Sequence, residues 1–278
     1  MQIEILGTGF PAMIVTHAIT IYCKSTDKPA PKIVMYGSSN PPQKVGARFY
    51  EREIPMMPGE KIKSRTVSTE SKGEIEDYIE KLGGPLTAYN RPRPEFLAFD
   101  YHQTYAQLWE KYAGHISPLF MSVEDVNKSS WDGVDFVFNT LPRPAFFGRR
   151  EAQLFAASRH WRLDESEANA DFAYSGVKSG DQNFIIFDGS TEASWYRITN
   201  IFGLMSIEWQ HEKRPPIQDV LPEILPLGVP KEMGLLDTYP TWRENTVLTH
   251  VGPLARWRPC TDIAEVYFDT MKVLRGDY

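Results

Sequence analysis

The chain has 278 residues, of which 42% are hydrophobic and 24% charged, and its formal net charge is −6 at pH 7. These values are typical of a globular protein with one large domain or two interleaved domains and a sizeable core. The negative charge excludes a generally basic surface that coats nucleic acid, although a local basic groove remains compatible with it. The two cysteines, Cys23 and Cys260, are expected to pack as small apolar residues in a reduced setting.

The chain opens with no basic segment before its first apolar run, and that run is broken by glycines. No apolar run reaches the roughly 18 residues of a membrane span. We therefore expect neither a signal peptide nor a transmembrane helix, and we expect a cytoplasmic protein.

A glycine-rich stretch follows the first predicted strand. Residues 2–6 alternate and are β-prone, and residues 10–23 predict a helix. Between them, Gly7 would allow a tight turn, Gly9 would leave room for a pyrophosphate, and Ala12 would let helix and strand pack closely. This GxGxxA pattern indicates a dinucleotide-binding turn, with a turn that binds nothing as the alternative.

The second predicted strand, residues 32–39, ends in serines. Dinucleotide-binding folds often place Asp or Glu here for the ribose hydroxyls. Ser38 and Ser39 stand there instead. Either their hydroxyls hydrogen-bond the ribose, or the ribose is held elsewhere.

The rest of the chain alternates helical, strand-like and irregular patterns. In order, we expect a loop over 40–48, a surface segment over 59–75 that is mobile or becomes ordered on binding, and helices over 73–84 and 101–116. An apolar strand should end near Asn139, and the sequence over 150–210 is largely strand-like. A long excursion rich in Pro and Gly is expected over 214–234, followed by a closing strand, loop and helix. The closing helix would begin near Thr261 or Asp262, either of which suits an N-cap.

Four separated segments resemble FAD-dependent flavoproteins of the UDP-galactopyranose mutase and amine-oxidase kind. They are ILGTGFPA (5–12), VGARF (45–49), DFVFNTLPRPAFF (135–147) and HVGPLARW (250–257). The resemblance implies an α/β fold in which a Rossmann-like FAD-binding domain carries an inserted β-rich substrate domain. The FAD-binding domain would comprise residues 1–58, 115–142 and 245–278, and the substrate domain residues 59–114 and 143–244.

The segment SWYRITNIFGLMSIEW (194–209) further resembles small phage-type relatives of thymine hypermodification. That resemblance implies an FAD-dependent enzyme that uses flavin N5 to transfer an amino acid to an activated pyrimidine in phage DNA. Its partners would be a nucleotide or modified-base DNA and an amino acid, with no membrane, in the host cytoplasm. The alternatives are an FAD-dependent amine or amino-acid oxidoreductase and a non-catalytic nucleotide-binding scaffold.

The motif and the resemblance together imply a set of cofactor-binding residues. They are Gly7, Gly9, Phe10, Pro11, Ala12, Ser38, Ser39, Arg48, Thr140, Gly252, Leu254, Ala255, Arg256 and Trp257. Arg48 would donate two hydrogen bonds from its planar guanidinium group to a pyrophosphate. Alternatively, Arg48 is a solvent-exposed charged residue of a loop. Arg256 and Trp257 would support the phosphates and pack the ring, and Trp257 is equally compatible with the core.

The candidate catalytic residues are Arg197, Tyr196 and Glu208. Tyr196 and Arg197 are neighbours in a predicted strand, so their side chains would point to opposite faces. Arg197 would bind a substrate phosphate or carboxylate, with Glu208 of the next strand as its partner. A purely structural ion pair between the two is the alternative.

The histidines have no metal-ligand spacing, and no metal site is expected. His250 stands just before the closing flavin-type segment. We expect it to be a structural histidine.

Overall fold

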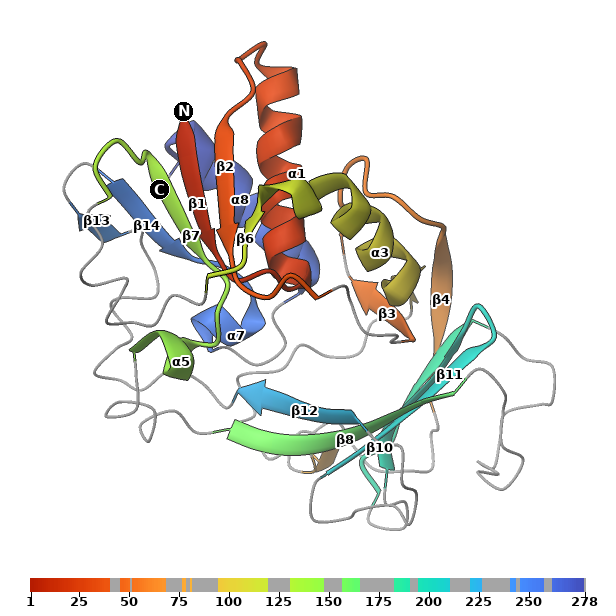
Figure 1. Cartoon of the computed structure of the whole chain (residues 1–278). Coiled ribbons are helices and arrows are strands. Elements are labelled where there is room, and N and C mark those ends of the chain that lie inside the picture. The colour runs from red at the N-terminus through yellow and green to blue at the C-terminus, as the bar shows by residue number, and fades with distance from the viewer. Residues whose placement is uncertain are drawn as a thin grey trace.

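The computed structural model arranges the chain as two β-sheets with helices packed around them (Figure 1). It describes residues 1–40, 46–50, 52–68, 77–78, 81, 95–119, 131–147, 157–165, 183–190, 195–210, 221–226, 241–243, 246–257 and 262–277. The helix expected over 73–84 lies largely outside these residues. Among the described helices, none combines the length and the hydrophobicity needed to cross a membrane.

Sheet A is a mostly parallel sheet with the order β13-β14-β7-β1-β2-β6. Its strands are β1 (Gln2–Leu6), β2 (Lys32–Tyr36), β6 (Ile116–Ser117), β7 (Phe136–Asn139), β13 (Thr241–Arg243) and β14 (Thr246–His250). All neighbours from β14 to β6 pair in parallel, and β13 joins the edge antiparallel to β14. The predicted first strand is confirmed, and the second ends at Tyr36, before the serines. The carboxyl ends of β14, β7, β1 and β2 therefore meet at one edge.

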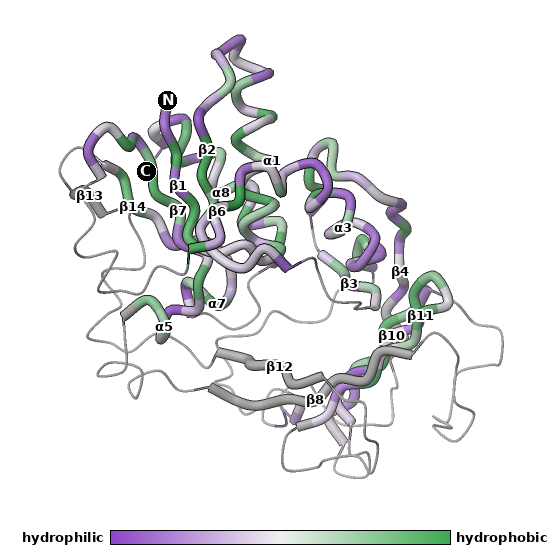
Figure 2. Tube along the Cα trace, viewed as in Figure 1, coloured by the Kyte–Doolittle hydropathy of each residue, from purple (hydrophilic) through white to green (hydrophobic). Residues whose placement is uncertain are grey.

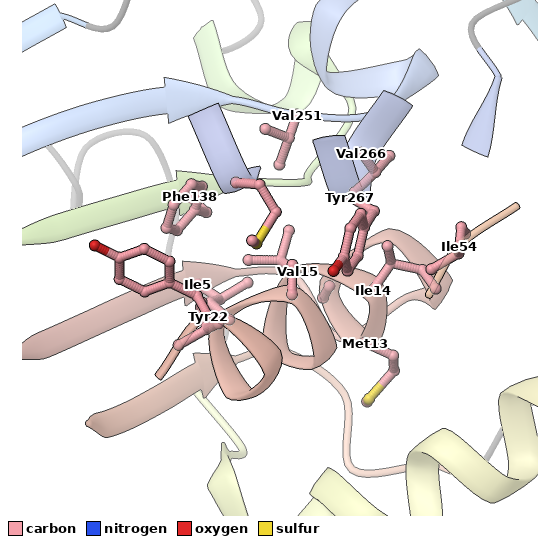
Figure 3. Packing of buried hydrophobic residues seen from close by; sticks show 14 of the residues in the cluster. Ile5, Met13, Ile14, Val15, Tyr22, Ile54, Phe138, Val251, Val266 and Tyr267 are labelled. Carbon is pink, nitrogen blue, oxygen red and sulfur yellow. The ribbon is translucent and has the colours of Figure 1, made fainter. Parts of the chain in front are cut away.

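The helix α1 (Phe10–Ser25) connects β1 to β2 and confirms the predicted helix. It is buried on most sides because it packs against sheet A and also against α8 (Ile263–Arg275) and α3 (Tyr101–Tyr112). Figure 3 shows its side chains among those of β1, β7 and α8, with Val15 near the centre of this core. The hydrophobic residues of α1 and the central strands stand out in Figure 2.

The opposite face of sheet A carries a smaller core. Because side chains alternate along a strand, Leu6 and Val137 point away from α1. They pack with Trp131, Val134 and Phe146, the last in the short helix α5 (Arg143–Phe147). Both faces of the sheet are thus covered, as is usual for parallel sheets.

Sheet B has the order β12-β8-β11-β10-β9-β4-β5-β3. Its strands are β3 (Ala47–Tyr50), β4 (Lys61–Ser68), β5 (Glu95–Asp100), β8 (Ala157–Glu165), β9 (Phe184–Phe187), β10 (Trp195–Ile201), β11 (Leu204–Gln210) and β12 (Leu221–Pro226). All pairs are antiparallel except β4 with β9. The sheet curls, so that its edge strand β3 lies close to β10 and β11.

Two expectations from the sequence are wrong in sheet B. The supposed mobile surface segment over 59–75 contains β4, an internal strand between β5 and β9. The Pro- and Gly-rich excursion over 214–234 contains β12, which occupies the sheet edge, where proline is tolerated.

The domain division drawn from the resemblance stays a prediction. β3 lies in the range assigned to the FAD-binding domain, yet it pairs with β5 of sheet B. β13 lies in the range assigned to the substrate domain, yet it pairs with β14 of sheet A. Both pairings lie across the predicted boundaries.

Candidate functional site

The carboxyl edge of sheet A gathers most of the residues expected to hold a cofactor. This edge faces sheet B (Figure 1). The residues that lie at it are Gly7, Gly9, Phe10, Pro11, Ala12, Ser38, Ser39, Thr140, Gly252, Leu254, Ala255, Arg256 and Trp257. They come from four chain segments that are far apart in the sequence, and the parallel pairing of β14, β7, β1 and β2 brings them together. In open α/β sheets, ligands bind outside this edge.

Gly7 makes the tight turn that its position in the motif predicts. Its φ of +108° belongs to a region that residues with a Cβ avoid, and a Cβ there would collide with Oγ1 of Thr140. That hydroxyl donates a hydrogen bond to the carbonyl of Leu6, at 2.7 Å. The missing side chain of Gly7 therefore leaves the space that the hydroxyl of Thr140 occupies, and the hydrogen bond of Thr140 connects the end of β7 to the end of β1.

Gly9 leaves the start of α1 open. It is exposed between buried Thr8 and Phe10, and a Cβ built on it meets only Cδ of Pro11, at 3.7 Å. Gly9 is the N-cap of α1, with no side-chain cap and no acidic residue in the first turn. A helix begins with backbone N–H groups that lack helical partners and with a partial positive charge. This arrangement suits a phosphate.

Ala12 fills the third position of the motif. It is fully buried, where the first turn of α1 packs against the strands. A larger side chain would push helix and sheet apart. The three positions of the predicted pattern therefore have the local geometry of a dinucleotide-binding turn.

An aromatic residue of α3 is hydrogen-bonded to the turn formed by residues 7–9, which we call the glycine loop. Tyr105 donates its hydroxyl to the carbonyl of Thr8 at 2.9 Å, and the hydroxyl of Thr8 donates to the carbonyl of Ser38 at 2.9 Å. Burial raises the pKa of Tyr105, so the phenol stays a donor. The sequence predicts a helix over 101–116, which includes Tyr105. Nothing in its local pattern indicates this contact, because the partner lies 97 residues away.

The C-terminal segment closes the same edge. Gly252 has a φ of +96°, and a Cβ there would lie 3.3 Å from Cβ of Pro11. It precedes the short helix α7 (Pro253–Arg256), and Arg256 donates from Nε to the carbonyl of His250 at 3.1 Å. Nη1 of Arg256 also pairs with Asp269 of α8 at 2.6 Å. Arg256 thus ties α7 to β14 and α8.

Trp257 is only 4% exposed, which is compatible both with a core residue and with packing on a cofactor, so its assignment to the cofactor stays a prediction. Asp262 is the N-cap of α8, since its carboxylate accepts from the N–H of Ala264 at 3.1 Å, which confirms one of the two predicted caps.

His250 ends β14 beside Asn139 at the end of β7. Asn139 accepts from the N–H of Leu141 through its side-chain oxygen and donates from its nitrogen to Nδ1 of His250, at 2.8 Å. Nδ1 is therefore unprotonated and the neutral ring carries its proton on Nε2. Burial, with smaller contributions from the charges of Arg143 and Arg256, lowers the pKa of His250 to about 3. These are the surroundings of a structural histidine.

Lowering the pH from about 7 to about 5 is expected to remove about 2 kcal/mol of unfolding free energy through His250. The unfolded ring takes up a proton below pH 6.5, whereas the folded ring stays neutral until about 3. The contribution of the neutral His250 ring to the free energy of unfolding is therefore fully present above pH 6.5 and is lost as the pH falls towards 3. In His250→Gln the loss measured by urea unfolding should be smaller by that amount. Equal losses in both proteins would contradict the buried neutral ring.

A second cluster of charged side chains lies in sheet B. Arg197 of β10 stands opposite Glu208 of β11, and Nη2 of Arg197 forms an ion pair with Oε2 of Glu208. Arg48 of β3 joins them, with Nη1 3.8 Å from Oε1 of Glu208. The partnership of Arg197 and Glu208 is the one expected from the sequence. Arg48 lies with these two residues rather than at the glycine loop, and its assignment to the cofactor stays a prediction.

Tyr196 lies beside this cluster, since its ring centroid is 6.0 Å from the guanidinium carbon of Arg197, and it is buried at 4% exposure. Its ring centroid is 6.2 Å from that of Tyr78. The three candidate catalytic residues are thus neighbours, and their catalytic roles stay predictions. Within the part of the chain that the structure describes, no group of His, Cys, Asp and Glu is arranged to hold a metal ion.

Comparison with known proteins identifies a fold but no family. No protein-family model matches the chain, and no curated protein matches it by sequence. The structure is similar to the 2,6-dihydroxypyridine-3-hydroxylase of Arthrobacter nicotinovorans, at 9% identity and a TM-score of 0.50, with 99% of this chain and 86% of that chain covered. It is also similar to MibH, a tryptophan 5-halogenase, at 9% identity and a TM-score of 0.52, with 98% of this chain and 66% of that chain covered.

A third similar structure is Xcc4156, a flavin-dependent halogenase from Xanthomonas campestris, at 10% identity and a TM-score of 0.49, covering 99% of this chain and 70% of that chain. At these identities the likenesses to the hydroxylase and MibH concern the fold alone. The predicted α/β class, with a Rossmann-like parallel sheet and a β-rich second part, is confirmed.

Proposed function

We propose that the carboxyl edge of sheet A binds FAD. The single observation that carries this proposal is Gly9, an exposed glycine with open space beside it at an uncapped helix N-terminus. The backbone around Gly9 and the first turn of α1 would hold the pyrophosphate, as in other glycine-rich turns. Thr140 and Gly252 shape the adjoining backbone from two other strand ends. The residues present therefore fit the group.

We further propose that the protein is an FAD-dependent enzyme that acts on a nucleotide or a DNA base. A hydroxylase and a halogenase share its fold, which supports an enzyme. Bound FAD would supply either a nucleophilic N5 in its reduced form or an acceptor for two electrons. Arg197 would hold the anionic group of the substrate, with Tyr196 and Glu208 beside it. The finer proposal is the transfer of an amino acid to an activated pyrimidine of phage DNA, in the host cytoplasm.

The non-catalytic scaffold has one observation in its favour. Ser38 and Ser39 follow β2 where an acid would bind the ribose, and the side chain of Ser38 already accepts from the N–H of Asn40, at 3.1 Å. A weaker hold on the ribose would favour a nucleotide-binding protein over an FAD enzyme. Cofactor content separates these two functions.

Purified protein is expected to be yellow and to release FAD when heated, because the glycine loop and residues 250–257 lie at the same carboxyl edge of sheet A. The measurement is the visible spectrum, followed by chromatography of the released compound. A colourless protein that also fails to bind added FAD would remove the cofactor proposal and favour the scaffold.

A transferase and an oxidase differ in their products. The protein would be incubated with candidate amino acids and phosphorylated hydroxymethyl-pyrimidine DNA, with and without a flavin reductant. A transferase should give coupled product by mass and consume no oxygen per turnover, whereas an oxidase should form hydrogen peroxide in proportion to its amine. Peroxide without coupled product would overturn the transferase proposal.

A further inference from the structure

We infer that Tyr105 of α3 is a positioning residue for the cofactor, because its hydroxyl fixes the Thr8–Gly9 peptide so that the N–H of Gly9 points outward to bind the pyrophosphate. This inference rests on the proposed FAD site. It gives a role in cofactor binding to α3, a helix that supplies none of the residues expected to contact FAD.

The hydroxyl of Tyr105 has a defined acceptor in the glycine loop. It donates to the carbonyl of Thr8 at 2.9 Å. The ring of Tyr105 packs on that of Phe10, with 5.5 Å between the ring centroids. α3 begins at a capped end, where the carboxylate of Asp100 accepts from the N–H of Gln103 at 2.8 Å. Packing therefore holds the donor in place, and the donor in turn holds the carbonyl of Thr8.

The planarity of the peptide bond carries this constraint to Gly9. In a trans peptide, the C=O group and the N–H group that follows it point in opposite directions. Because the carbonyl of Thr8 points at Tyr105, the N–H of Gly9 points away from Tyr105. Gly9 is exposed, and within the described part of the chain its N–H donates to no other protein group. This N–H is therefore a free donor with a fixed direction.

The next peptide along the chain is fixed by the helix itself. The carbonyl of Gly9 accepts from the N–H of Met13 at 3.2 Å, so it points along α1. The N–H of Phe10 therefore points back out of the start of the helix. Pro11 has no N–H, so Gly9 and Phe10 supply the two consecutive donors of the turn. An anion held by both donors depends on the orientation of the peptide that precedes Gly9.

A glycine at position 9 makes the contact with Tyr105 necessary. A flip of the Thr8–Gly9 peptide changes mainly ψ of Thr8 and φ of Gly9, and glycine adopts positive φ about as readily as negative φ. The flipped peptide would direct the carbonyl of Thr8, with its partial negative charge, at the phosphates. The hydroxyl of Thr8 donates to the carbonyl of Ser38 at 2.9 Å, which holds the side chain of Thr8 rather than its carbonyl. The orientation of the peptide is therefore left to Tyr105.

Tyr105→Phe tests the inference in the full chain, because it removes the hydroxyl and keeps the packing of the ring. The apo-protein of this variant should bind FAD about fivefold to tenfold more weakly than the parent, since a smaller fraction of the molecules would hold the binding orientation. The measurement is the FAD dissociation constant, from quenching of FAD fluorescence.

Tyr112→Phe is the matched control. It makes the same change in the same helix and removes the hydrogen bond between the Tyr112 hydroxyl and Nδ1 of His17, at 3.1 Å. It should lower the thermal midpoint as Tyr105→Phe does, because each variant loses one hydrogen bond in the interior. Its FAD affinity should equal that of the parent, since this hydrogen bond does not involve the glycine loop.

An NMR measurement follows the peptide itself. Thr8–Gly9 is the only Thr–Gly pair in the sequence, so isotope labels on the threonine carbonyl carbon and the glycine nitrogen select a single amide resonance. The couplings between the amide proton and the two α-protons of Gly9 report its φ. They should change in Tyr105→Phe, as positive φ becomes populated, and stay the same in Tyr112→Phe. A purely structural role for Tyr105 would leave them unchanged.

Three results would overturn the inference alone. They are equal FAD affinities in the parent and Tyr105→Phe, equal losses of FAD affinity in Tyr105→Phe and Tyr112→Phe, and Gly9 couplings that Tyr105→Phe does not alter. A parent that binds no FAD would instead remove the proposed cofactor and the inference with it. The affinity of the parent therefore distinguishes failure of the FAD proposal from failure of the role of Tyr105.

Discussion

Gly9→Asp is expected to lower FAD affinity by about a hundredfold or more while leaving the protein at least as stable as the parent. Gly9 has a φ of −69° and a ψ of 179°, a conformation that any residue adopts. Asp is a preferred N-cap, and its carboxylate would accept from the N–H of Ala12, since Pro11 has none. The same carboxylate would occupy the open position beside Gly9 and repel a pyrophosphate. Stability and cofactor affinity should therefore move in opposite directions.

Two further variants separate the causes of this effect. Gly9→Asn also caps the helix but carries no charge, so it should lose only the part of the affinity that is due to size. Gly114→Asp makes the same change at another exposed glycine with open space around it, away from the proposed site, and should leave FAD affinity unchanged. The measurements are the FAD dissociation constant of apo-protein and the thermal midpoint. If Gly9→Asp bound FAD as the parent does, the loop would be a turn without a ligand.

The sequence was sufficient for the local features of the edge. The turn at Gly7, the open position at Gly9 and the close packing at Ala12 each depend on residues only a few positions apart. The cap at Asp262 is local in the same sense. The pairing of Arg197 with Glu208 could be predicted because β10 and β11 form a hairpin, in which 11 positions separate the two residues.

Features that depend on distant partners could not be predicted from the sequence. The polar residues of β4 predict a surface segment that is mobile or becomes ordered on binding, whereas the strand is held by pairing with β5 and by a parallel pairing with β9, more than a hundred residues away. The resemblance implies that Arg48 binds the cofactor, and that assignment stays a prediction, but no pattern along the chain indicates its contact with Glu208. Glu208 comes close to Arg48 only because sheet B curls and brings β3 near β11. A residue pattern along the chain indicates neither the curl of sheet B nor the parallel pairing of β4 with β9.

Gly7→Ala is expected to cost about 3 kcal/mol or more of unfolding free energy, the sum of two separate effects. A side chain at a φ of +108° strains the backbone, and the added Cβ would collide with Oγ1 of Thr140. Since Oγ1 also binds the carbonyl of Leu6, it cannot move without losing that hydrogen bond. The measurement is the free energy of unfolding in urea.

Gly133→Ala isolates the strain, because Gly133 has a φ of +76° and nothing within 4 Å of an added Cβ. It should therefore cost less than Gly7→Ala. Thr140→Ala removes the colliding hydroxyl, so the double variant Gly7→Ala/Thr140→Ala should be more stable than the sum of the single variants predicts, by about 1 kcal/mol or more. Additive costs, or equal costs at Gly7 and Gly133, would show that the collision contributes nothing. A favourable coupling would instead establish that Thr140 requires glycine at position 7, and that the turn at the proposed cofactor edge is specified jointly by the ends of β1 and β7.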